Sequence, residues 1–256
     1  MRRYSFSKTS TFLRCPRLYR FRYLDRAEPE HLSVALPMGS AMHDAIQWDV
    51  AQRGTGDEPC AEEIHHVYRE LLEARIELSD CPVQGEPEEA IETGRRMIDA
   101  YVAWGRVQDV ASIEGEHAAN IGDELVLEGR IDFVRDGHDV EILELKTAAR
   151  SWTQDQADLS LQAASYSLLT GIDQVRFVVL TKTKQPKVQE LVTHVGPERR
   201  ALLCDTVSEV DRAVRVGSFP RNVSPMTCRG CEFRNRCLGT KALEPVTVST
   251  ASTVSI

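Results

Sequence analysis

Four short runs of apolar and β-branched residues, all in the second half of the chain, restrict its fold more than any other feature of the sequence. Runs of this composition, bounded by turn residues, are typical of β-strands, and we predict strands at 125–134, 140–146, 175–181 and 188–194. Asp136-Gly137 indicates a hairpin turn between the first two strands. Helical patterns at 156–169 and 197–216 follow the second and fourth strands. The sequence therefore predicts an α/β core.

The first 26 residues combine positive charge with aromatic rings. Ser5 or Ser7 can cap a helix that runs to about Arg14, and Pro16 should interrupt or restart it. The segment holds eight basic residues against one acid, with six aromatic residues between them. Such a segment could hold phosphates and stack bases, and the candidate DNA contacts in it are Arg14, Arg17, Tyr19 and Arg22. The alternative is an amphipathic helical hairpin with solvated arginines.

The middle of the first half is helical and acidic. A helix begins near Pro37 and carries His43, and two stretches at 59–79 and 86–106, rich in Glu and Ala, predict a helical insertion at about 57–109. The formal net charge of −8 argues against a generally basic surface, so any DNA contact must come from local patches. The acidic helices are predicted to be solvated or, with the N-terminal segment, to dock a protein partner.

Two carboxylates and a lysine are predicted to meet in the first strand pair. Residues two apart in a strand share a face, so Glu144 and Lys146 project together while Leu143 and Leu145 point the other way. The hairpin can bring Asp132 beside Glu144. Adjacent carboxylates repel unless a cation neutralises them, and hard oxygen ligands suit magnesium or manganese. A cross-strand salt bridge gives the same pattern and remains the alternative.

Three further polar side chains have helical positions that fit such a site. His43 lies on the predicted helix behind Gly39, and Gln162 and Tyr166 lie four residues apart on one face of the helix after the lysine strand. A lone histidine on a helix is more often a core or surface residue than a ligand. Lys146 beside a metal ion could position a water or stabilise the charge on a phosphoryl oxygen.

The four motifs, in this order, resemble the RecB-like branch of the PD-(D/E)XK nucleases over residues 5–238. They are a Gly-x-x-x-His helix, a Gly-Arg-Ile-Asp strand, a Glu-Leu-Lys strand and a Gln-x-x-x-Tyr helix. The resemblance implies a restriction-endonuclease-like fold, in which helices flank a mixed β-sheet. Ile131 stands where the superfamily name has proline, a change that this branch tolerates.

The same resemblance assigns roles to the site residues. It implies metal ligands at His43, Asp132, Glu144 and the main-chain carbonyl of Leu145, a catalytic Lys146, with Gln162 and Tyr166 supporting the site or touching DNA. Nitrogen donors suit softer ions, so we expect manganese to support activity alongside magnesium.

Three of the seven cysteines are closely spaced. Cys228, Cys231 and Cys237 form a C-x2-C-x5-C cluster, and Cys15 near the opposite chain end is the candidate fourth ligand. Spacing alone allows zinc or an iron–sulfur cluster. RecB-like nucleases with one early and three late cysteines bind a 4Fe-4S cluster, so the resemblance implies that cofactor, which would link segments 5–26 and 225–238. We expect ordinary small apolar residues in helices at Cys60, Cys81 and Cys204.

The resemblance also implies a function. The chain looks most like the stand-alone CRISPR-associated exonucleases, the fourth Cas protein, which trim DNA before spacer integration in antiviral defence and work with an integrase. We therefore expect a metal-dependent DNA exonuclease that acts on single-stranded ends. A stand-alone phage or DNA-repair exonuclease is the near alternative, and a non-catalytic iron–sulfur or zinc DNA-binding subunit is the alternative from another class.

Length and composition predict one domain and a tail. The chain has 256 residues, 42% of them hydrophobic, and can bury one substantial core over residues 1–238. Residues 239–256 are rich in Ser, Thr and Val without a helical period, which favours a flexible tail, with a docked edge strand as the alternative. No apolar run approaches the length of a membrane span and the start lacks a secretory pattern, so we expect a soluble, cytoplasmic protein.

Overall fold

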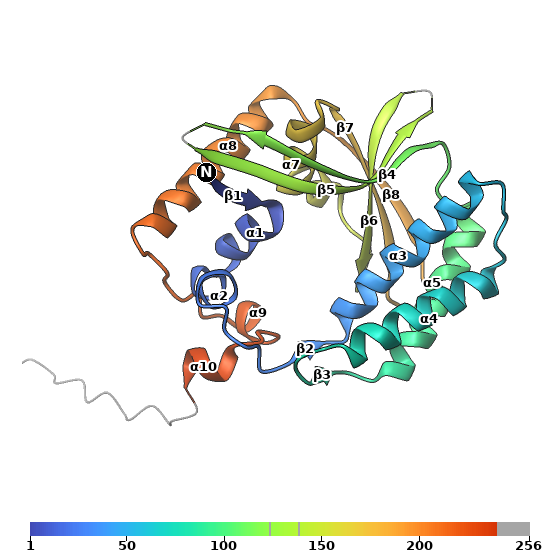
Figure 1. The fold of residues 1–256 in the computed structure, drawn as a ribbon, viewed down its shortest axis with the longest axis horizontal. Helices are drawn as coiled ribbons and strands as arrows, with labels where there is room; N and C mark the ends of the chain where they lie inside the picture. The colour runs from blue at the N-terminus through green and yellow to red at the C-terminus, as the bar shows by residue number, and fades with distance from the viewer. Residues whose placement is uncertain (123, 138, 240–256) are drawn as a thin grey trace, which may run out of the picture.

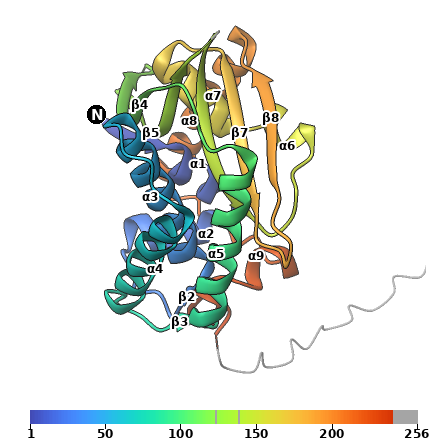
Figure 2. The ribbon, with the colours of Figure 1, turned by 90° about the vertical axis from the view of Figure 1, so that its right-hand side faces the viewer.

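A mixed six-stranded sheet lies at the centre of the computed structural model, which describes residues 1–122, 124–137 and 139–239. Helices cover both faces of the sheet (Figures 1 and 2). The strands are β1 (Arg2–Ser5), β4 (Val110–Asn120), β5 (Leu125–Asp136), β6 (Val140–Ala148), β7 (Gln174–Thr181) and β8 (Val188–His194). The order is β1-β5-β6-β7-β8, with β4 on the other edge of β5. This architecture confirms the predicted α/β fold with a mixed sheet.

Strand β5 is the longest strand and contacts three others. Its first four residues pair in parallel with β1, from Arg2 opposite Leu125 to Ser5 opposite Glu128. Its last four pair antiparallel with β6, from Phe133 opposite Leu143 to Asp136 opposite Val140. Residues 129–131, between these two pairings, are paired with β4 on the opposite edge, and no described residue of β1 or β6 pairs with residues 129–132. A fork therefore opens along β5 between β1 and β6.

The N-terminal segment folds as the sequence predicts. The Ser5 hydroxyl accepts a hydrogen bond from the Lys8 N–H and caps α1 (Phe6–Arg14). Cys15 is extended, and Pro16 opens the short α2 (Pro16–Tyr19), which continues as the π-helical turn η1 (Arg20–Leu24). The interruption at Pro16 follows from its missing N–H and fixed φ.

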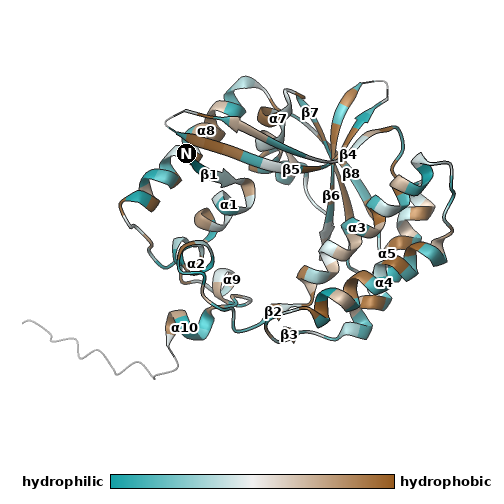
Figure 3. Ribbon diagram, viewed as in Figure 1, coloured by the Kyte–Doolittle hydropathy of each residue, from teal (hydrophilic) through white to brown (hydrophobic). Residues whose placement is uncertain are grey.

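Three helices cover one face of the sheet. They are α3 (Ala35–Gly54), α4 (Ala61–Glu77) and α5 (Pro87–Trp104), and the short strands β2 (Leu32–Ser33) and β3 (Val83–Gln84) pair beside them. Hydrophobic and hydrophilic residues alternate along α4 and α5 (Figure 3). The buried residues of all three helices share one apolar cluster with Leu143 and Leu145 of β6. The predicted helical insertion thus packs into the same core as the sheet.

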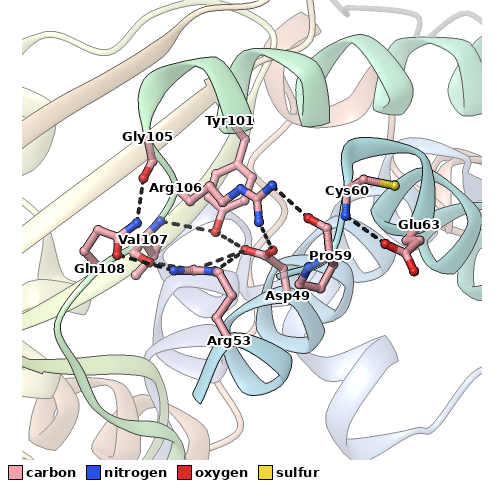
Figure 4. Close-up of polar contacts among 10 residues, drawn as sticks. All are labelled: Asp49, Arg53, Pro59, Cys60, Glu63, Tyr101, Gly105, Arg106, Val107 and Gln108. Carbon is pink, nitrogen blue, oxygen red and sulfur yellow. Dashed lines mark hydrogen bonds and ion pairs between the residues drawn. The ribbon is translucent and has the colours of Figure 1, made fainter. Parts of the chain in front are cut away.

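A buried carboxylate, Asp49, holds α3 against the end of α5 (Figure 4). It accepts hydrogen bonds of 2.9 Å from the Tyr101 hydroxyl and 2.9 Å from Arg106, and an ion pair of 3.2 Å joins it to Arg53 one turn along α3. The Tyr101 hydroxyl also accepts a hydrogen bond from the Val107 N–H. Both carboxylate oxygens of Asp49 have partners, which is the condition under which a buried charge is tolerated.

The other face carries α6 (Gln154–Asp158), α7 (Leu161–Thr170) and α8 (Pro197–Arg215), and α7 and α8 pack with α1. Their apolar residues form a second cluster with alternate strand residues, among them Ile142 and Phe177. The prediction of a single helix at 156–169 was wrong. Helix α6 ends at Asp158, and the Ser160 hydroxyl accepts a hydrogen bond from the Ala163 N–H and so caps a second helix, α7. Strands β1 and β4 of this sheet and the short strands β2 and β3 were not predicted.

The C-terminal end of the described chain returns to the segment that follows α1 (Figure 1). The short helices α9 (Pro225–Cys228) and α10 (Arg234–Leu238) lie beside α2 and η1, where Phe233 packs with Leu18 and Phe21. Glu30 accepts hydrogen bonds from the main-chain N–H groups of Asn235 and Arg236. The predicted tail at 239–256 lies, beyond Gly239, outside the described residues. No helix in the described ranges is long and apolar enough to cross a membrane.

Candidate active site

The predicted carboxylates and lysine lie in the fork of the sheet. Asp132 is the last residue of β5 before its pairing with β6, and its Oδ2 accepts a hydrogen bond of 2.9 Å from the Leu145 N–H. Glu144 follows the end of that pairing on β6, and its side chain is buried on the face toward α7. Lys146 Nζ lies 2.5 Å from Glu144 Oε1. Leu143 and Leu145 point into the opposite cluster, as strand alternation predicts.

Helix α7 supports the glutamate. The Gln162 Nε2 group lies 2.7 Å from Glu144 Oε1 and 2.7 Å from the Tyr166 hydroxyl. All three side chains are buried. The spacing of four residues places Gln162 and Tyr166 on the same helix face, as predicted. Gly129 permits this approach, because a Cβ there would lie 3.4 Å from the Tyr166 ring and 2.8 Å from Leu169.

Helix α3 brings His43 to the same place from the other side. Its Nδ1 lies 3.3 Å from Asp132 Oδ2. One turn earlier Gly39 lies close to β6, where a Cβ would be 3.2 Å from Thr147 Oγ1. The small residue thus lets α3 approach the strand that carries the glutamate and lysine. The structure brings together all the predicted catalytic side chains, from β5, β6, α3 and α7.

Burial and neighbouring charges shift the pKa values of three site residues. Burial raises the pKa of Glu144 to about 7, and the charge of Lys146 only partly offsets this. Burial also opposes the charge on His43, but the hydrogen bond and charge of Asp132 raise its pKa overall. For Asp132, the contacts with His43 and the Leu145 N–H outweigh burial and lower the pKa.

One atom of the site indicates where a cation fits. Glu144 Oε2 is buried and has no hydrogen-bond partner, although a buried carboxylate oxygen normally has one. A carboxylate oxygen beside a second carboxylate and an imidazole suits a hard or borderline divalent ion. Within the described ranges, however, no group of three or more His, Cys, Asp or Glu side chains is placed so that it could hold a metal ion.

The four predicted cluster cysteines line one small cavity. Cys15, Cys228, Cys231 and Cys237 surround it together with Leu18 and Phe21. Burial raises the pKa of the Cys231 thiol, and Cys15 is near enough to contribute. The other three cysteines lie elsewhere: Cys204 is in α8, but Cys60 is the exposed N-cap of α4 and Cys81 lies in the turn after it, so helical positions for these two were wrong.

The four predicted DNA contacts of the N-terminal segment lie in different environments. Tyr19 is buried, and its ring packs edge-on against Phe12 and beside Tyr23, so it cannot stack on a base. Arg22 forms an ion pair with Glu232 that holds the two chain ends together. Arg14 is exposed, and Arg17 is half-buried.

Two hollows flank the site. The His117 hollow, of about 660 Å³, is lined by β1, β4 and β5 residues and includes His117, Gly129 and Tyr166. The Trp152 hollow, also about 660 Å³, is lined by Lys146, Trp152 and α6–α7 residues. Volumes of this size match small-ligand sites. Phe6 and Gln162 line both hollows, which therefore meet at the site.

A group of cations lies just beyond the lysine strand. Lys182 follows β7, and its N–H donates a 2.7 Å hydrogen bond to the carbonyl of Ala148 at the end of β6. Lys184 and Lys187 are in the same β7–β8 turn, which Thr181 closes by accepting a hydrogen bond from the Lys187 N–H. None of these lysines has an ion-pair partner among the described residues. Burial lowers the pKa of Lys182. Sequence reasoning missed this basic turn, although its spacing is visible in the sequence.

The fold and site together define a restriction-endonuclease-like nuclease, in which an aspartate and a Glu-x-Lys strand meet beside a mixed sheet. The chain belongs to the PD-(D/E)XK nuclease superfamily, which matches residues 3–238. Nucleases of this superfamily use divalent metals such as magnesium or manganese. None of the curated proteins compared with the chain matches it.

Solved structures support the fold. A protein from Eubacterium rectale, described provisionally as an exonuclease, has a TM-score of 0.51 and 15% identity, covering 94% of this chain and 88% of its own. SSO0001 has a TM-score of 0.36 and 13% identity, covering 88% of this chain and 93% of its own. Rai1 from Scheffersomyces stipitis, in complex with (3′-NADP)+ and calcium, has a TM-score of 0.29 and 12% identity, covering 86% of this chain and 70% of its own. The first likeness supports the fold alone, and the other two carry no weight.

Proposed function

We propose that this chain is a divalent-metal-dependent DNA exonuclease that hydrolyses phosphodiester bonds at single-stranded ends. The observation that carries the proposal is the unpartnered, buried Oε2 of Glu144 in the fork beside Asp132, His43 and Lys146. A salt bridge formed for stability would leave no such atom, because an unpaired buried oxygen costs free energy. Membership of a nuclease superfamily supports the same conclusion.

The donor set fits a metal ion. His43, Asp132, Glu144 and the main-chain carbonyl of Leu145 would hold it after moving toward one another, since their side chains as placed do not form a group that could hold a metal ion. When bound, the ion would polarise a phosphate and help to ionise water. The imidazole donor favours manganese over magnesium.

The protein's own side chains would do the rest. Lys146 would align the attacking water and stabilise charge on the phosphoryl oxygen. Gln162 would fix the orientation of Glu144 through its 2.7 Å hydrogen bond, and the buried Tyr166 would fix Gln162. Water adds to phosphorus, the phosphodiester P–O bond breaks, and the leaving oxygen takes a proton.

An assay on end-labelled DNA tests the proposal. The wild-type protein should shorten single strands when manganese or magnesium is added, and Glu144→Ala or Lys146→Ala should lower the rate at least about 100-fold, the usual effect of losing a general acid–base group. Arg69→Gln is the matched control, since Arg69 lies on α4 in an exposed ion pair with Glu73. Unchanged cutting by both site variants would remove the mechanism. Binding without cutting by the wild type would favour the non-catalytic DNA-binding subunit.

A 4Fe-4S cluster held by Cys15, Cys228, Cys231 and Cys237 is a second part of the proposal. Four thiols around one apolar-walled cavity support it, and zinc is the alternative with the same ligands. A bound cluster would link the segment around Cys15 to the C-terminal segment, and binding of the cluster would be coupled to folding. Anaerobically purified Cys231→Ala should be colourless and less stable. Cys204→Ala should keep its colour, because Cys204 does not line the cavity. Full iron content in Cys231→Ala would contradict the assignment.

The biological setting belongs to the proposal as well. Length and the four cysteines resemble the CRISPR-associated exonucleases, so a role in CRISPR spacer acquisition with an integrase as partner is proposed, and a phage or DNA-repair role is the alternative. Co-purification with a CRISPR integrase separates the two. A product ladder from each labelled end gives the polarity of cleavage.

A further inference from the structure

One aromatic side chain of the N-terminal segment has no partner in the core. Tyr4, Phe12, Tyr19 and Phe21 are buried in apolar clusters, and Tyr23 packs against one of them. Phe6 is only half-buried and belongs to none of the three clusters found among the described residues. Its ring also makes no contact with another aromatic ring there. The stacking capacity of the segment is therefore concentrated in one residue.

The fold fixes where this ring lies. Ser5 is the last residue of β1 and pairs with Glu128 of β5, so Phe6 comes at the point where the fork opens. It is the first residue of α1, whose cap at Ser5 holds the turn in place. Phe6 lines the His117 hollow and the Trp152 hollow alike. The ring thus stands at the junction of two nucleotide-sized spaces, opposite Lys146 and Gln162.

We propose that Phe6 is a stacking platform for a base of the substrate strand, and that the two hollows it separates hold the nucleotides on either side of the phosphate at Lys146. This inference rests on the proposed function, because it names how the same site holds single-stranded nucleic acid. Every base offers a π-face, so a single exposed ring accepts any sequence. Inside a duplex both faces of a base are covered by neighbouring pairs, and exposing one costs unstacking free energy, so the platform favours an unpaired strand.

The polar lining of the hollows fits this assignment. The His117 hollow carries Arg3, Arg130 and His117 beside the carboxylates Glu116 and Glu128, and Arg3 donates a 2.9 Å hydrogen bond to Glu128. This mixed lining suits the donor and acceptor groups of base edges better than a purely anionic ligand. The Trp152 hollow has Lys146 at one end and the apolar Leu159 and Trp152 at the other. A strand that crosses the site would leave one hollow and enter the other past the Phe6 ring.

Binding without chemistry tests the platform. Fluorescence anisotropy of a labelled single strand, measured on the intact protein without divalent metal, should show a roughly 5- to 150-fold higher Kd for Phe6→Ala, the range for losing one base stack. Phe6→Trp should bind like the wild type, and Phe6→Leu, which keeps the apolar area, should bind like Phe6→Ala. Leu13→Ala is the control, because Leu13 is an exposed apolar residue on the same helix and lines neither hollow.

Binding of strands that each lack the base at one position gives a second measurement. A purely structural role of Phe6 would not affect it. One abasic position should weaken wild-type binding, and that penalty should vanish in Phe6→Ala. Equal Kd values for wild type and Phe6→Ala, or a leucine variant as tight as the tryptophan one, would overturn the platform. If the wild type cuts DNA and Phe6→Ala binds the strand as tightly as the wild type, only the stacking role of Phe6 is contradicted. If the wild type binds through Phe6 but never cuts, only the proposed hydrolysis is contradicted. If the wild type does not bind the strand, both proposals are contradicted.

Discussion

Gln162 and Glu144 are joined by a hydrogen bond of 2.7 Å between helix α7 and strand β6. The amide is buried, and its other contact is the Tyr166 hydroxyl. Gln162 and Lys146 both contact one carboxylate oxygen of Glu144, and the other oxygen is buried without a hydrogen-bond partner. The amide thus determines which oxygen is free to bind a cation.

Removing this amide should weaken activity without removing a catalytic group. We expect Gln162→Leu to lower metal affinity or the cleavage rate by about 10- to 100-fold, as for other residues that orient metal ligands. Manganese titrations of the cleavage rate would measure it. Gln154→Leu is the control, since Gln154 is exposed on α6 and contacts Asp158. A Gln162→Leu enzyme with wild-type manganese dependence would show that Glu144 needs no such support.

The buried Glu144 should make the metal-free protein sensitive to pH. Its folded pKa of about 7 lies above the ordinary value of 4.5, so between these values the folded protein keeps a proton that the unfolded chain releases. Stability should therefore fall as pH rises through this window.

Glu144→Gln isolates this effect. Without metal, the variant should melt at a higher temperature than the wild type at pH 8, and the difference should shrink toward pH 5. Manganese should restore the melting temperature of the wild type at pH 8 and leave that of the variant unchanged. Melting curves by circular dichroism would measure both effects. A difference that grows toward acid pH would reverse the sign and contradict the burial argument.

The Asp49 network should matter for stability rather than chemistry. Asp49→Ala leaves Arg53 and Arg106 without their carboxylate, and breaking a buried pair in this way costs about 3–5 kcal/mol. Asp44→Ala, on the same helix but in a half-exposed pair with Arg75, should cost less than about 1 kcal/mol. Urea unfolding would compare them. Equal free energies of unfolding for the two variants would show that burial of the network adds nothing.

The basic turn after β7 should contribute to strand binding. Each phosphate contact on a single strand contributes about 0.7 to the slope of log K against log salt. Changing Lys182, Lys184 and Lys187 to glutamine should reduce that slope by up to about 2, whereas Arg69→Gln should leave it unchanged. Anisotropy titrations at several salt concentrations would measure it. An unaltered slope would exclude the turn from the path of the strand.

Much of the site could be predicted because its residues obey local periodicities. Strand alternation correctly placed Glu144 with Lys146 and away from Leu143, and helix spacing correctly placed Gln162 with Tyr166. The hairpin indicated by Asp136-Gly137 correctly set Asp132 near Glu144. These relationships depend on sequence separations of a few residues.

What could not be predicted depends on distant contacts. The sequence of β1, Arg-Arg-Tyr-Ser, has no apolar run, and it is a strand because β5 offers it a free edge. The break at Ser160 was missed because its cap was read as helix interior. Tyr19 was predicted on the surface, but Phe12 and Tyr23 cover it. The importance of Phe6 appears only once its neighbouring aromatic residues are found buried.

The pairing of β1 with β5 affects how the protein is made. The first strand leaves the ribosome long before its partner, and its anchor Asp211, which holds Arg2 at 2.7 Å, is translated later still. Until then the N-terminal peptide has no docking site, and α1 with Phe6 at its start cannot take its final position. In the proposed enzyme, the part of the site that contains Phe6 therefore takes its final position late, so a nascent chain, or one truncated before Asp211, should cut DNA poorly.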